Sequence, residues 1–354
     1  MTDLEKLCSR VTEAADCAVI TDDVNRRYFT AMKSSAGTLV VFPEKAYFII
    51  DFRYIEKARK TVTACEVILQ DKLYEQINEL IEKHGAKTVA VNADTCTLSE
   101  LIAYQQKLNA EVIADTKLAK IITEIRTVKS QEQIDKMIKA QRIAEKGFAH
   151  MLDFIKVGRT EKEIQLELDY YMLRNGAEAL SFDTIALSGA NTSLPHGVPS
   201  DKKVESGEFV LMDFGATYDG WHSDMTRTVC VGKPSDKMKS VYETVLTAQL
   251  TALDAVKAGM SGKALDKIAR DIITDAGYGD NFGHSLGHGV GVEIHENPYA
   301  SPSREDILPE NSIVTVEPGI YLEGEFGVRI EDFVVVTENG CINMTKAPKE
   351  LICL

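Results

Sequence analysis

Two aspartates occupy unusual places in the stretch LMDFGATYDGWHSDMTRTV, residues 211–229. Asp213 lies within an apolar run that is typical of a strand, and Asp224 follows a turn. The dipeptide Asp219-Gly220 is a strong signal for a two-residue hairpin loop. The register that this loop sets makes the two aspartates diagonal neighbours on one face of the ladder, where their carboxylates can converge.

Two further residues of this hairpin are expected to support the aspartates. Gly215 lies opposite Asp224 in the same register and leaves room for the aspartate side chain. Thr226 lies opposite Asp213, and its hydroxyl is placed to donate a hydrogen bond to that carboxylate. We therefore expect one hairpin that presents two acids and their immediate partners on one face.

A second pair of acids occupies the corresponding places of a later hairpin. The segment IVTVEPG, residues 313–319, echoes the segment FVLMDFG at 209–215, so that Glu317 stands where the first hairpin has its first aspartate. Glu331 follows, and it lies directly opposite Glu317 if the intervening loop centres on Gly324. The even spacing permits a shared face for these two carboxylates as well.

Four converging carboxylates require compensation of their charge. Without it they would repel one another and could not all remain ionised. A cation is the simplest partner for several buried acids. Oxygen-rich ligand sets favour manganese or related ions, and one imidazole would add affinity for Mn, Fe, Co or Zn. Solvated hairpin faces on which the acids pair with Lys or Arg are the alternative, but the agreement of two hairpins favours a metal site.

The distribution of histidines supports such a site. Five of the seven lie between residues 196 and 295, namely His196, His222, His284, His288 and His295. Three of them fall in GHSLGHGVGVEIHENP, residues 283–298, where glycines around His288 allow the close backbone approach that a metal or substrate site needs. A lone histidine would more often be a core or surface residue. His222, beside the hairpin turn, is expected to be exposed.

The elements that must position these residues are predicted twice in the second half of the chain. Four helices are expected to begin at capping residues, namely Ser130, Thr160, Ser235 and Ser261. The first of them is expected to end at Gly158. Strand-like segments follow each pair of helices, over 182–231 and 282–336. This repeat predicts a pseudo-twofold domain whose two acidic hairpins face each other, and chance similarity of the hairpins is the alternative.

The first part of the chain predicts a separate α/β domain, since 354 residues exceed one ordinary core. Strands rich in β-branched residues are expected at 17–21, 37–51, 65–69 and 87–93. Between the last two, LYEQINELIEKHG has helical spacing and ends at Gly85. This assignment follows from pattern alone and indicates no chemistry.

Composition excludes several classes of partner. The net charge is −14 and no run of Lys or Arg forms a stripe, so nucleic acid and anionic membranes are poor candidates. No segment approaches the ~20 apolar residues of a membrane span, and the N-terminus lacks the apolar stretch of a signal peptide. The seven cysteines are odd in number and scattered, which fits reduced thiols. We expect a cytoplasmic protein.

Together, two aspartates eleven residues apart, GHGVG, EPG and GVRIED resemble the dinuclear-metal peptidases of the pita-bread fold, metallopeptidase family M24. That family includes aminopeptidase P, prolidase, methionine aminopeptidase and the metal-free creatinases. The resemblance is strong over residues 126–354, whereas residues 1–125 resemble the creatinase-type N-terminal domain in length and general pattern. It implies a two-domain α/β protein, with a creatinase-like α/β domain at 1–125 and a pseudo-twofold pita-bread (α+β) catalytic domain at 126–354.

The resemblance also implies a set of metal ligands. They are Asp213, Asp224, His288, Glu317 and Glu331. In such sites the residues matching Asp224 and Glu331 bridge two divalent ions. The residue matching Asp213 holds one of the ions, and those matching His288 and Glu317 hold the other. We expect two ions per chain, with manganese favoured over cobalt, zinc or iron.

Further site residues follow from the same resemblance. His196 in LPHG, His284 and His295 match histidines that support the site or contact substrate, and Glu317 matches a proton shuttle. Arg329 matches an arginine near the site and could neutralise a carboxylate in a bidentate pair. A surface salt bridge is the alternative role for this arginine.

The activity that the resemblance implies is metal-assisted hydrolysis of an amide at a free N-terminus. We expect a metallo-exopeptidase that acts on peptides with proline at the second position, an Xaa-Pro aminopeptidase, and we expect a homodimer. Xaa-Pro dipeptidase, or prolidase, is the alternative. Some dipeptidases of the family place an arginine shortly after HExP to hold the substrate carboxylate, and here HENPYASPSR has Tyr299 there and Arg304 further on. Intact ligand positions disfavour both creatinase-like chemistry and a non-catalytic peptide-binding protein.

Overall fold

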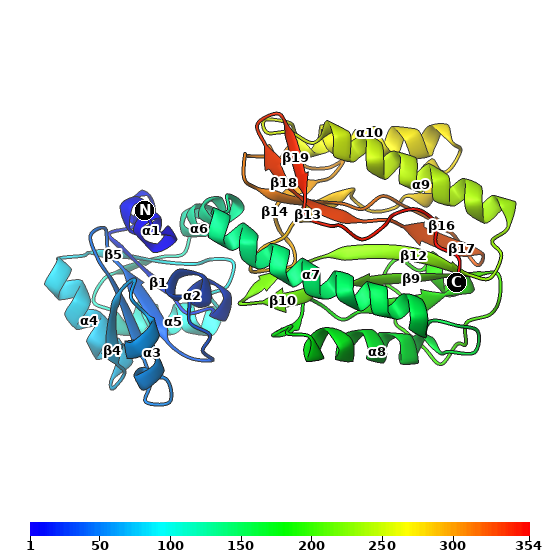
Figure 1. The fold of residues 1–354 in the computed structure, drawn as a ribbon. Coiled ribbons are helices and arrows are strands. Elements are labelled where there is room, and N and C mark those ends of the chain that lie inside the picture. The colour runs from blue at the N-terminus through cyan, green and yellow to red at the C-terminus, as the bar shows by residue number, and fades with distance from the viewer. The chain divides into compact units, whose positions relative to one another are not determined.

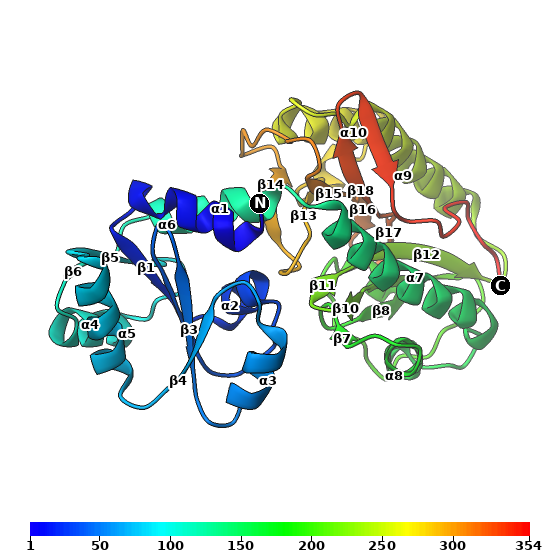
Figure 2. The same cartoon turned by 60° about the vertical axis from the view of Figure 1, so that its left-hand side comes forward.

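The structure is a computed structural model that describes residues 1–354. The chain forms two compact units, Met1–Arg126 and Thr127–Leu354 (Figure 1). Figure 2 shows the same elements from a second direction. None of the helices combines the length and the apolar character that crossing a membrane requires.

The first unit is built on a six-stranded mixed sheet in the order β4-β3-β2-β1-β5-β6. The strands are β1 (Cys17–Ile20), β2 (Thr38–Val41), β3 (Ala46–Ile50), β4 (Glu66–Leu69), β5 (Thr88–Val91) and β6 (Glu111–Ile113). The helices are α1 (Asp3–Arg10), α2 (Asp23–Thr30), α3 (Ile55–Thr61), α4 (Leu73–His84), α5 (Leu98–Lys107) and α6 (Lys117–Thr127). The expected α/β character of this part is confirmed.

Alternation along each strand sorts the side chains of this sheet into two cores. On β1, Ala18 and Ile20 pack with apolar residues of α1, α3 and α6, whereas Cys17 and Val19 pack with residues of α4 and α5. Helices therefore cover both faces of the sheet, which explains why its strands read as nearly continuous apolar runs.

The second unit contains four long helices and two groups of antiparallel strands. The helices are α7 (Gln131–Phe154), α8 (Glu161–Arg174), α9 (Asp236–Ala255) and α10 (Gly262–Asp275). The strands of the first group are β7 (Ala179–Leu180), β8 (Ile185–Ser188), β9 (Glu208–Phe214), β10 (Ala216–Tyr218), β11 (Trp221–His222) and β12 (Met225–Val231). Those of the second group are β13 (Gly287–Gly289), β14 (Glu296–Ala300), β15 (Ile313–Val316), β16 (Gly319–Leu322), β17 (Phe326–Arg329), β18 (Asp332–Thr337) and β19 (Gly340–Asn343).

Each helix pair covers its own group of strands, as the predicted repeat requires. Residues of α7 and α8 share a core with β9 and β12, and residues of α9 and α10 share another with β15 to β18. In Figure 1 the two helix pairs lie on opposite outer sides, with the strands between them. All four helices begin at the predicted serine or threonine caps. The first, α7, ends at Phe154 rather than at Gly158, because Ile155 already has an extended backbone.

The first hairpin has the predicted register. Thr226 pairs with Asp213 between β12 and β9, and the loop residues Asp219 and Gly220 have φ of 49° and 81°. Positive φ at both loop positions is the geometry of a type I′ turn. A Cβ atom on Gly215 would lie 1.9 Å from the carbonyl oxygen of Ser223, so only glycine fits opposite the second aspartate.

The second hairpin has the register that was expected if its loop centres on Gly324. Gly319 pairs with Arg329 between β16 and β17, and Val316 pairs with Asp332 between β15 and β18. Glu317 and Glu331 therefore lie opposite each other where one pair of strands gives way to the next. The loop centres on Gly324, which has φ of 72°.

Candidate metal centre

The nine predicted site residues line one cavity of about 740 Å³. They are Asp213, Asp224, His288, Glu317, Glu331, His196, His284, His295 and Arg329. The acids come from both hairpins, and His288 comes from β13. The two groups of strands therefore face each other and bring together residues that are far apart in sequence.

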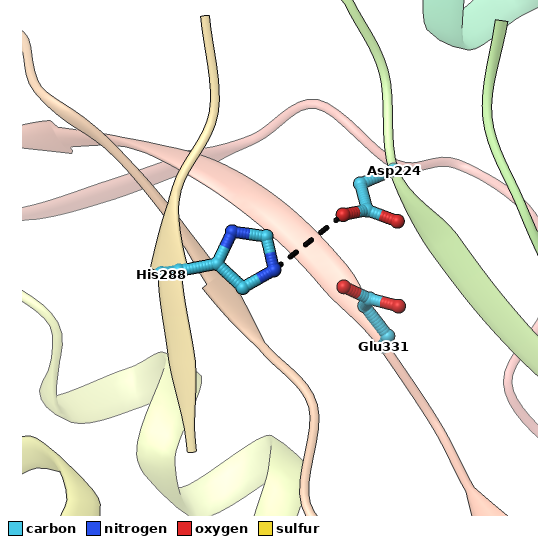
Figure 3. A group of neighbouring side chains, drawn as sticks. All are labelled: Asp224, His288 and Glu331. Atoms are coloured by element: carbon cyan, nitrogen blue, oxygen red, sulfur yellow. Dashed lines mark ion pairs between the residues drawn. The ribbon is translucent and has the colours of Figure 1, made fainter. Parts of the chain in front are cut away.

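Three of the five predicted ligands form the tightest group (Figure 3). The possible ligand atoms of Asp224, His288 and Glu331 all lie within 4.8 Å of one another. His288 Nε2 is 3.7 Å from Asp224 Oδ2 and 3.3 Å from Glu317 Oε1. Asp213 is the fifth member, and its carboxylate is turned toward an arginine rather than toward the imidazole.

Local contacts fix the orientation of His288. Its Nδ1 is 3.0 Å from the carbonyl oxygen of Gly289, so that Nδ1 carries the proton and Nε2 faces the acids. The hydroxyl of Thr315 accepts from the backbone N–H of His288 and donates to Glu317 Oε1, at 3.0 Å each. Thr315 therefore links β13, which carries His288, to Glu317.

The glycines of GHGVG allow close approach of backbone, as predicted. A Cβ atom on Gly287 would lie 2.0 Å from the carbonyl oxygen of Thr315, and one on Gly289 would lie 2.4 Å from that of Asn297. These glycines allow neighbouring strands to approach β13 closely. The close packing sets where His288 stands.

Arg329 connects three residues of the site. Its Nη2 is 2.5 Å from Asp213 Oδ2, its Nε donates to Thr226 Oγ1 at 3.1 Å, and its Nη1 donates to Tyr321 Oη at 2.8 Å. The predicted bidentate pair with a carboxylate is wrong, because the guanidinium divides its donors among these three partners and the carbonyl oxygen of Pro195. The hydroxyl of Thr226 donates to Glu331 Oε2 at 2.7 Å, and not to Asp213 as predicted.

A buried network lies behind the second hairpin. Arg227 is 1% exposed, and its Nη2 donates to Asp332 Oδ1 at 2.7 Å. The same side chain also donates to the backbone carbonyl oxygens of Glu331 and Pro348. Arg227 therefore fixes the backbone of one predicted ligand from the side opposite the cavity.

The acids carry more negative charge than the protein itself balances. Burial, together with the neighbouring carboxylates, raises the pKa of Asp224 and of Glu331 well above the ordinary range. Burial would also raise the pKa of Glu317, but the hydrogen bond and charge of His288 lower it to about 2. Burial opposes the charge on His288, yet Glu317 and Asp224 raise the pKa of this imidazole to about 9.

Two buried oxygens of the cluster have no hydrogen-bond partner, Asp213 Oδ1 and Glu331 Oε1. Buried polar atoms are rarely left unpaired, and a carboxylate oxygen can be satisfied by a cation as well as by a donor. Four carboxylates, one oriented imidazole and two unpaired oxygens fit a divalent metal centre.

Tyr321 belongs to the site and was not predicted from the sequence. Its hydroxyl lies 2.8 Å from His284 Nε2 and accepts from Arg329, and burial raises the pKa of this tyrosine to about 12. His284 Nδ1 lies 2.8 Å from the carbonyl oxygen of Ser285, so both ring nitrogens of His284 are engaged. The sequence feature that could have indicated a role for Tyr321 is Gly319, because a Cβ atom at that position would lie 2.5 Å from the tyrosine hydroxyl.

The remaining histidines differ in their surroundings. The His295 ring packs edge-on against that of His288 with centroids 4.4 Å apart, and burial lowers the pKa of His295. His196 lies in an exposed loop that lines the cavity. His222 lies outside the lining, and it is half-buried rather than exposed as predicted, because its Nδ1 lies 3.1 Å from the hydroxyl of Thr217.

Comparison with known proteins is consistent with this geometry. Residues 135–338 match metallopeptidase family M24, and residues 4–128 match the creatinase/prolidase N-terminal domain. The chain is 39% identical to an Xaa-Pro dipeptidase from Pyrococcus furiosus, over 99% of each chain. A solved Xaa-Pro dipeptidase from Bacillus anthracis superposes with a TM-score of 0.95 at 41% identity, covering 99% of each chain. An X-Pro aminopeptidase structure from Thermotoga maritima MSB8 has a TM-score of 0.91 at 38% identity, covering 96% of this chain and 98% of that one.

These matches confirm the predicted family and fold class. The matched family is a metallopeptidase family, and the acid and imidazole cluster supplies the ligand chemistry that a divalent metal requires. The chain belongs to metallopeptidase family M24 and carries the creatinase/prolidase N-terminal domain ahead of its peptidase domain.

Proposed function

We propose that this enzyme removes the N-terminal residue from peptides that have proline at the second position. The cluster of four carboxylates and one imidazole in a cavity of about 740 Å³ is the observation that carries the hydrolytic part of this proposal. Relatives named Xaa-Pro dipeptidase and X-Pro aminopeptidase, at 41% and 38% identity, support the proline part.

The metal would be held by the five predicted ligands, as two divalent ions per chain. They are Asp213, Asp224, His288, Glu317 and Glu331. We favour manganese because carboxylates dominate the set, and cobalt, zinc and iron also suit one imidazole. When bound, such ions polarise a carbonyl group and make hydroxide available near neutral pH.

The residues of the chain would then orient the metal ligands and transfer protons. Arg329 holds one oxygen of Asp213, and Thr226 holds one oxygen of Glu331, so each carboxylate presents its other oxygen to the cavity. Glu317, beside His288, is our candidate to accept a proton and return it to the leaving group. Asp224 and Glu331 are buried, which limits the contact of these two acids with water.

The histidines would divide into two kinds. His295 and His196 line the cavity and are our candidates to hydrogen-bond the reacting amide and its leaving side. His284 has both ring nitrogens engaged with Ser285 and Tyr321, so we assign it to holding the tyrosine and, through it, Arg329.

Preference for proline follows from the chemistry of its amide. The nitrogen of proline carries no N–H, so a site built for it need not accept a hydrogen bond there. A secondary amide bound in the same place would bury an unpaired N–H at a cost of about 1–3 kcal/mol.

Substrate length is the finer part of the proposal. Tyr299 lines the cavity, and Arg304 stacks on its ring at 4.2 Å while pairing with Asp306 at 3.0 Å. This arginine is therefore not presented to a substrate carboxylate, which favours peptides of three or more residues. The dipeptidase alternative is favoured by the names of several relatives and by Lys162, which lines the cavity and bonds the neutral side chain of Gln165 at 2.9 Å.

The test measures the rates at which the metal-loaded enzyme hydrolyses matched substrates. We expect Xaa-Pro-Xaa tripeptides to be hydrolysed faster than Xaa-Pro dipeptides, and at least about tenfold faster than Xaa-Ala-Xaa tripeptides. Equal rates on the proline and alanine peptides would refute the proline assignment. Faster hydrolysis of dipeptides, together with an increased KM for them in Lys162→Gln, would establish the dipeptidase alternative.

A further inference from the structure

A buried carboxylate outside the metal cluster lies at the base of one wall of the cavity. Glu161 is the first residue of α8 and is fully buried. It does not line the cavity. The loop whose ends it contacts, residues 188–200, contributes five consecutive lining residues, Pro195 to Pro199.

Glu161 binds both ends of this loop. Its Oε1 accepts from the backbone N–H of Ser188 at 2.7 Å and from the Ser188 hydroxyl at 3.2 Å. Its Oε2 accepts from the backbone N–H of Ser200 at 3.0 Å and from the Ser200 hydroxyl at 2.6 Å. The amide of Asn191 lies 3.0 Å from the first oxygen and 3.2 Å from the second. One carboxylate thus closes the loop at its base.

Direct charge pairing does not explain why this carboxylate is buried. Lys202 Nζ is 3.0 Å from the Ser188 hydroxyl and pairs with Glu208 at 2.7 Å, so it reaches Glu161 only through that hydroxyl. Burying a charge is costly unless hydrogen bonds replace its water. Here the hydrogen bonds come from the loop, and their common effect is to hold its two ends together.

The tip of the loop is not held by apolar packing. Leu194 is 54% exposed and Val198 is 81% exposed. Two further attachments are the hydrogen bond of 2.8 Å from the backbone N–H of Gly327 to the Thr192 hydroxyl and the bond of 3.4 Å from Arg329 Nη1 to the carbonyl oxygen of Pro195. The position of His196 therefore depends on the base of the loop and on these two bonds.

We propose that Glu161 is a positioning residue that holds the loop of His196 against the cavity and thereby sets substrate affinity. The expected effect on catalysis rests on the proposed function, whereas the effect on the loop does not. Glu161 touches no predicted metal ligand, so a substitution there should alter the loop that lines the cavity and leave the metal cluster unchanged.

The substitution Glu161→Gln tests this with little change of size. A glutamine has one oxygen and one NH₂ group, and either orientation places the NH₂ against a backbone N–H, that of Ser188 or that of Ser200. No flip of the amide satisfies both ends of the loop. Glu167→Gln on the same helix is the matched control, because Glu167 bonds His150 at 2.7 Å and a glutamine can keep that bond.

Three measurements separate positioning from general damage. In Glu161→Gln we expect faster hydrogen exchange of the amides in residues 188–200, and a KM for an Xaa-Pro-Xaa tripeptide raised roughly tenfold. We expect kcat to change less than about threefold and manganese binding to match the wild type. Glu167→Gln should match the wild type in every measurement.

The proposal is overturned if Glu161→Gln leaves both loop exchange and KM unchanged, or if it lowers kcat and manganese binding while KM stays constant. Ser200→Ala keeps the carboxylate but removes the hydroxyl bond of 2.6 Å, and it should show the same changes at smaller size even if Glu161→Gln does not fold. If the wild type itself hydrolyses no Xaa-Pro peptide, the proposed function fails, and loop exchange still decides the role of Glu161.

Discussion

Thr226 illustrates how strongly the acids depend on the side chains that orient them. Its hydroxyl accepts from Arg329 and donates to Glu331, and the same arginine holds Asp213. Partners of this kind fix the direction of a metal ligand before the metal arrives, and their loss commonly costs 10- to 100-fold in metal affinity or activity. At the scale of residues, hydrogen bonds within the protein therefore already orient the carboxylates of Asp213 and Glu331.

Removing a central acid should abolish activity, whereas removing a nearby histidine outside the cavity should not. We expect Asp224→Ala or Glu331→Ala to lower kcat/KM at least about a hundredfold and to reduce metal content. His222→Ala, which removes a side chain outside the lining, should stay within about twofold of wild type. Comparable losses in His222→Ala and Asp224→Ala would contradict our division of the residues.

Metal binding should release protons. Asp224 and Glu331 have a raised pKa, and the pKa of His288 is about 9, so the metal-free cluster holds protons at neutral pH. Ligands must lose their protons to bind a metal, so affinity should fall as the pH falls. Calorimetric titration at pH 7 in two buffers of different ionisation enthalpy should show release of at least about one proton. An observed enthalpy that does not depend on the buffer would exclude this coupling.

At the scale of elements, the first acidic hairpin depends on close approach of its strands. Gly215 faces the carbonyl oxygen of Ser223, where a Cβ atom would lie 1.9 Å away. The strand pair must separate to admit a methyl group, and such separation would shift the neighbouring aspartates. The positions of these two predicted ligands therefore depend on a residue that has no side chain.

The substitution Gly215→Ala should destabilise the peptidase unit and impair activity. Forced overpacking of this kind typically costs about 1–3 kcal/mol, which thermal unfolding detects as a lower Tm. Gly283→Ala is the matched control, because a Cβ atom there meets nothing within 4 Å. If both variants melt together with the wild type, the close contact at Gly215 is not a constraint.

The sequence allowed the register of the first hairpin to be predicted, because the turn signal Asp219-Gly220 is local and strand pairing has a period of two. The register of the second hairpin was predicted only on the condition that its loop centres on Gly324, and the structure meets this condition. The partners across the cavity could not be predicted, since they depend on how one hairpin meets the other. Thr226 was therefore assigned to Asp213 on its own hairpin, when it bonds Glu331 on the other.

At the scale of the whole molecule, the two units have separate cores, and the predicted metal ligands all belong to one of them. The single tryptophan, Trp221, lies on β11 in that same unit. Tryptophan fluorescence therefore reports the unfolding of the peptidase unit alone, while calorimetry detects both units.

Metal should stabilise one unit and not the other. A ligand that binds only the folded state at 100 times its Kd adds about 2.7 kcal/mol to the stability of the unit that binds it. We expect manganese to raise the fluorescence-detected Tm, and a chelator to lower it, while the calorimetric transition of the first unit stays in place. A fluorescence Tm that ignores manganese would place the binding site elsewhere.

The distribution of the proposed ligands over both hairpins has a consequence for the timing of synthesis. A ribosome makes the chain from its N-terminus, so Asp213 and Asp224 emerge well before Glu317 and Glu331. A nascent chain that ends between the hairpins holds two acids and lacks the pair that faces them. We therefore expect peptidase activity to begin only after both hairpins have left the ribosome, so that the enzyme stays inert throughout most of its own translation.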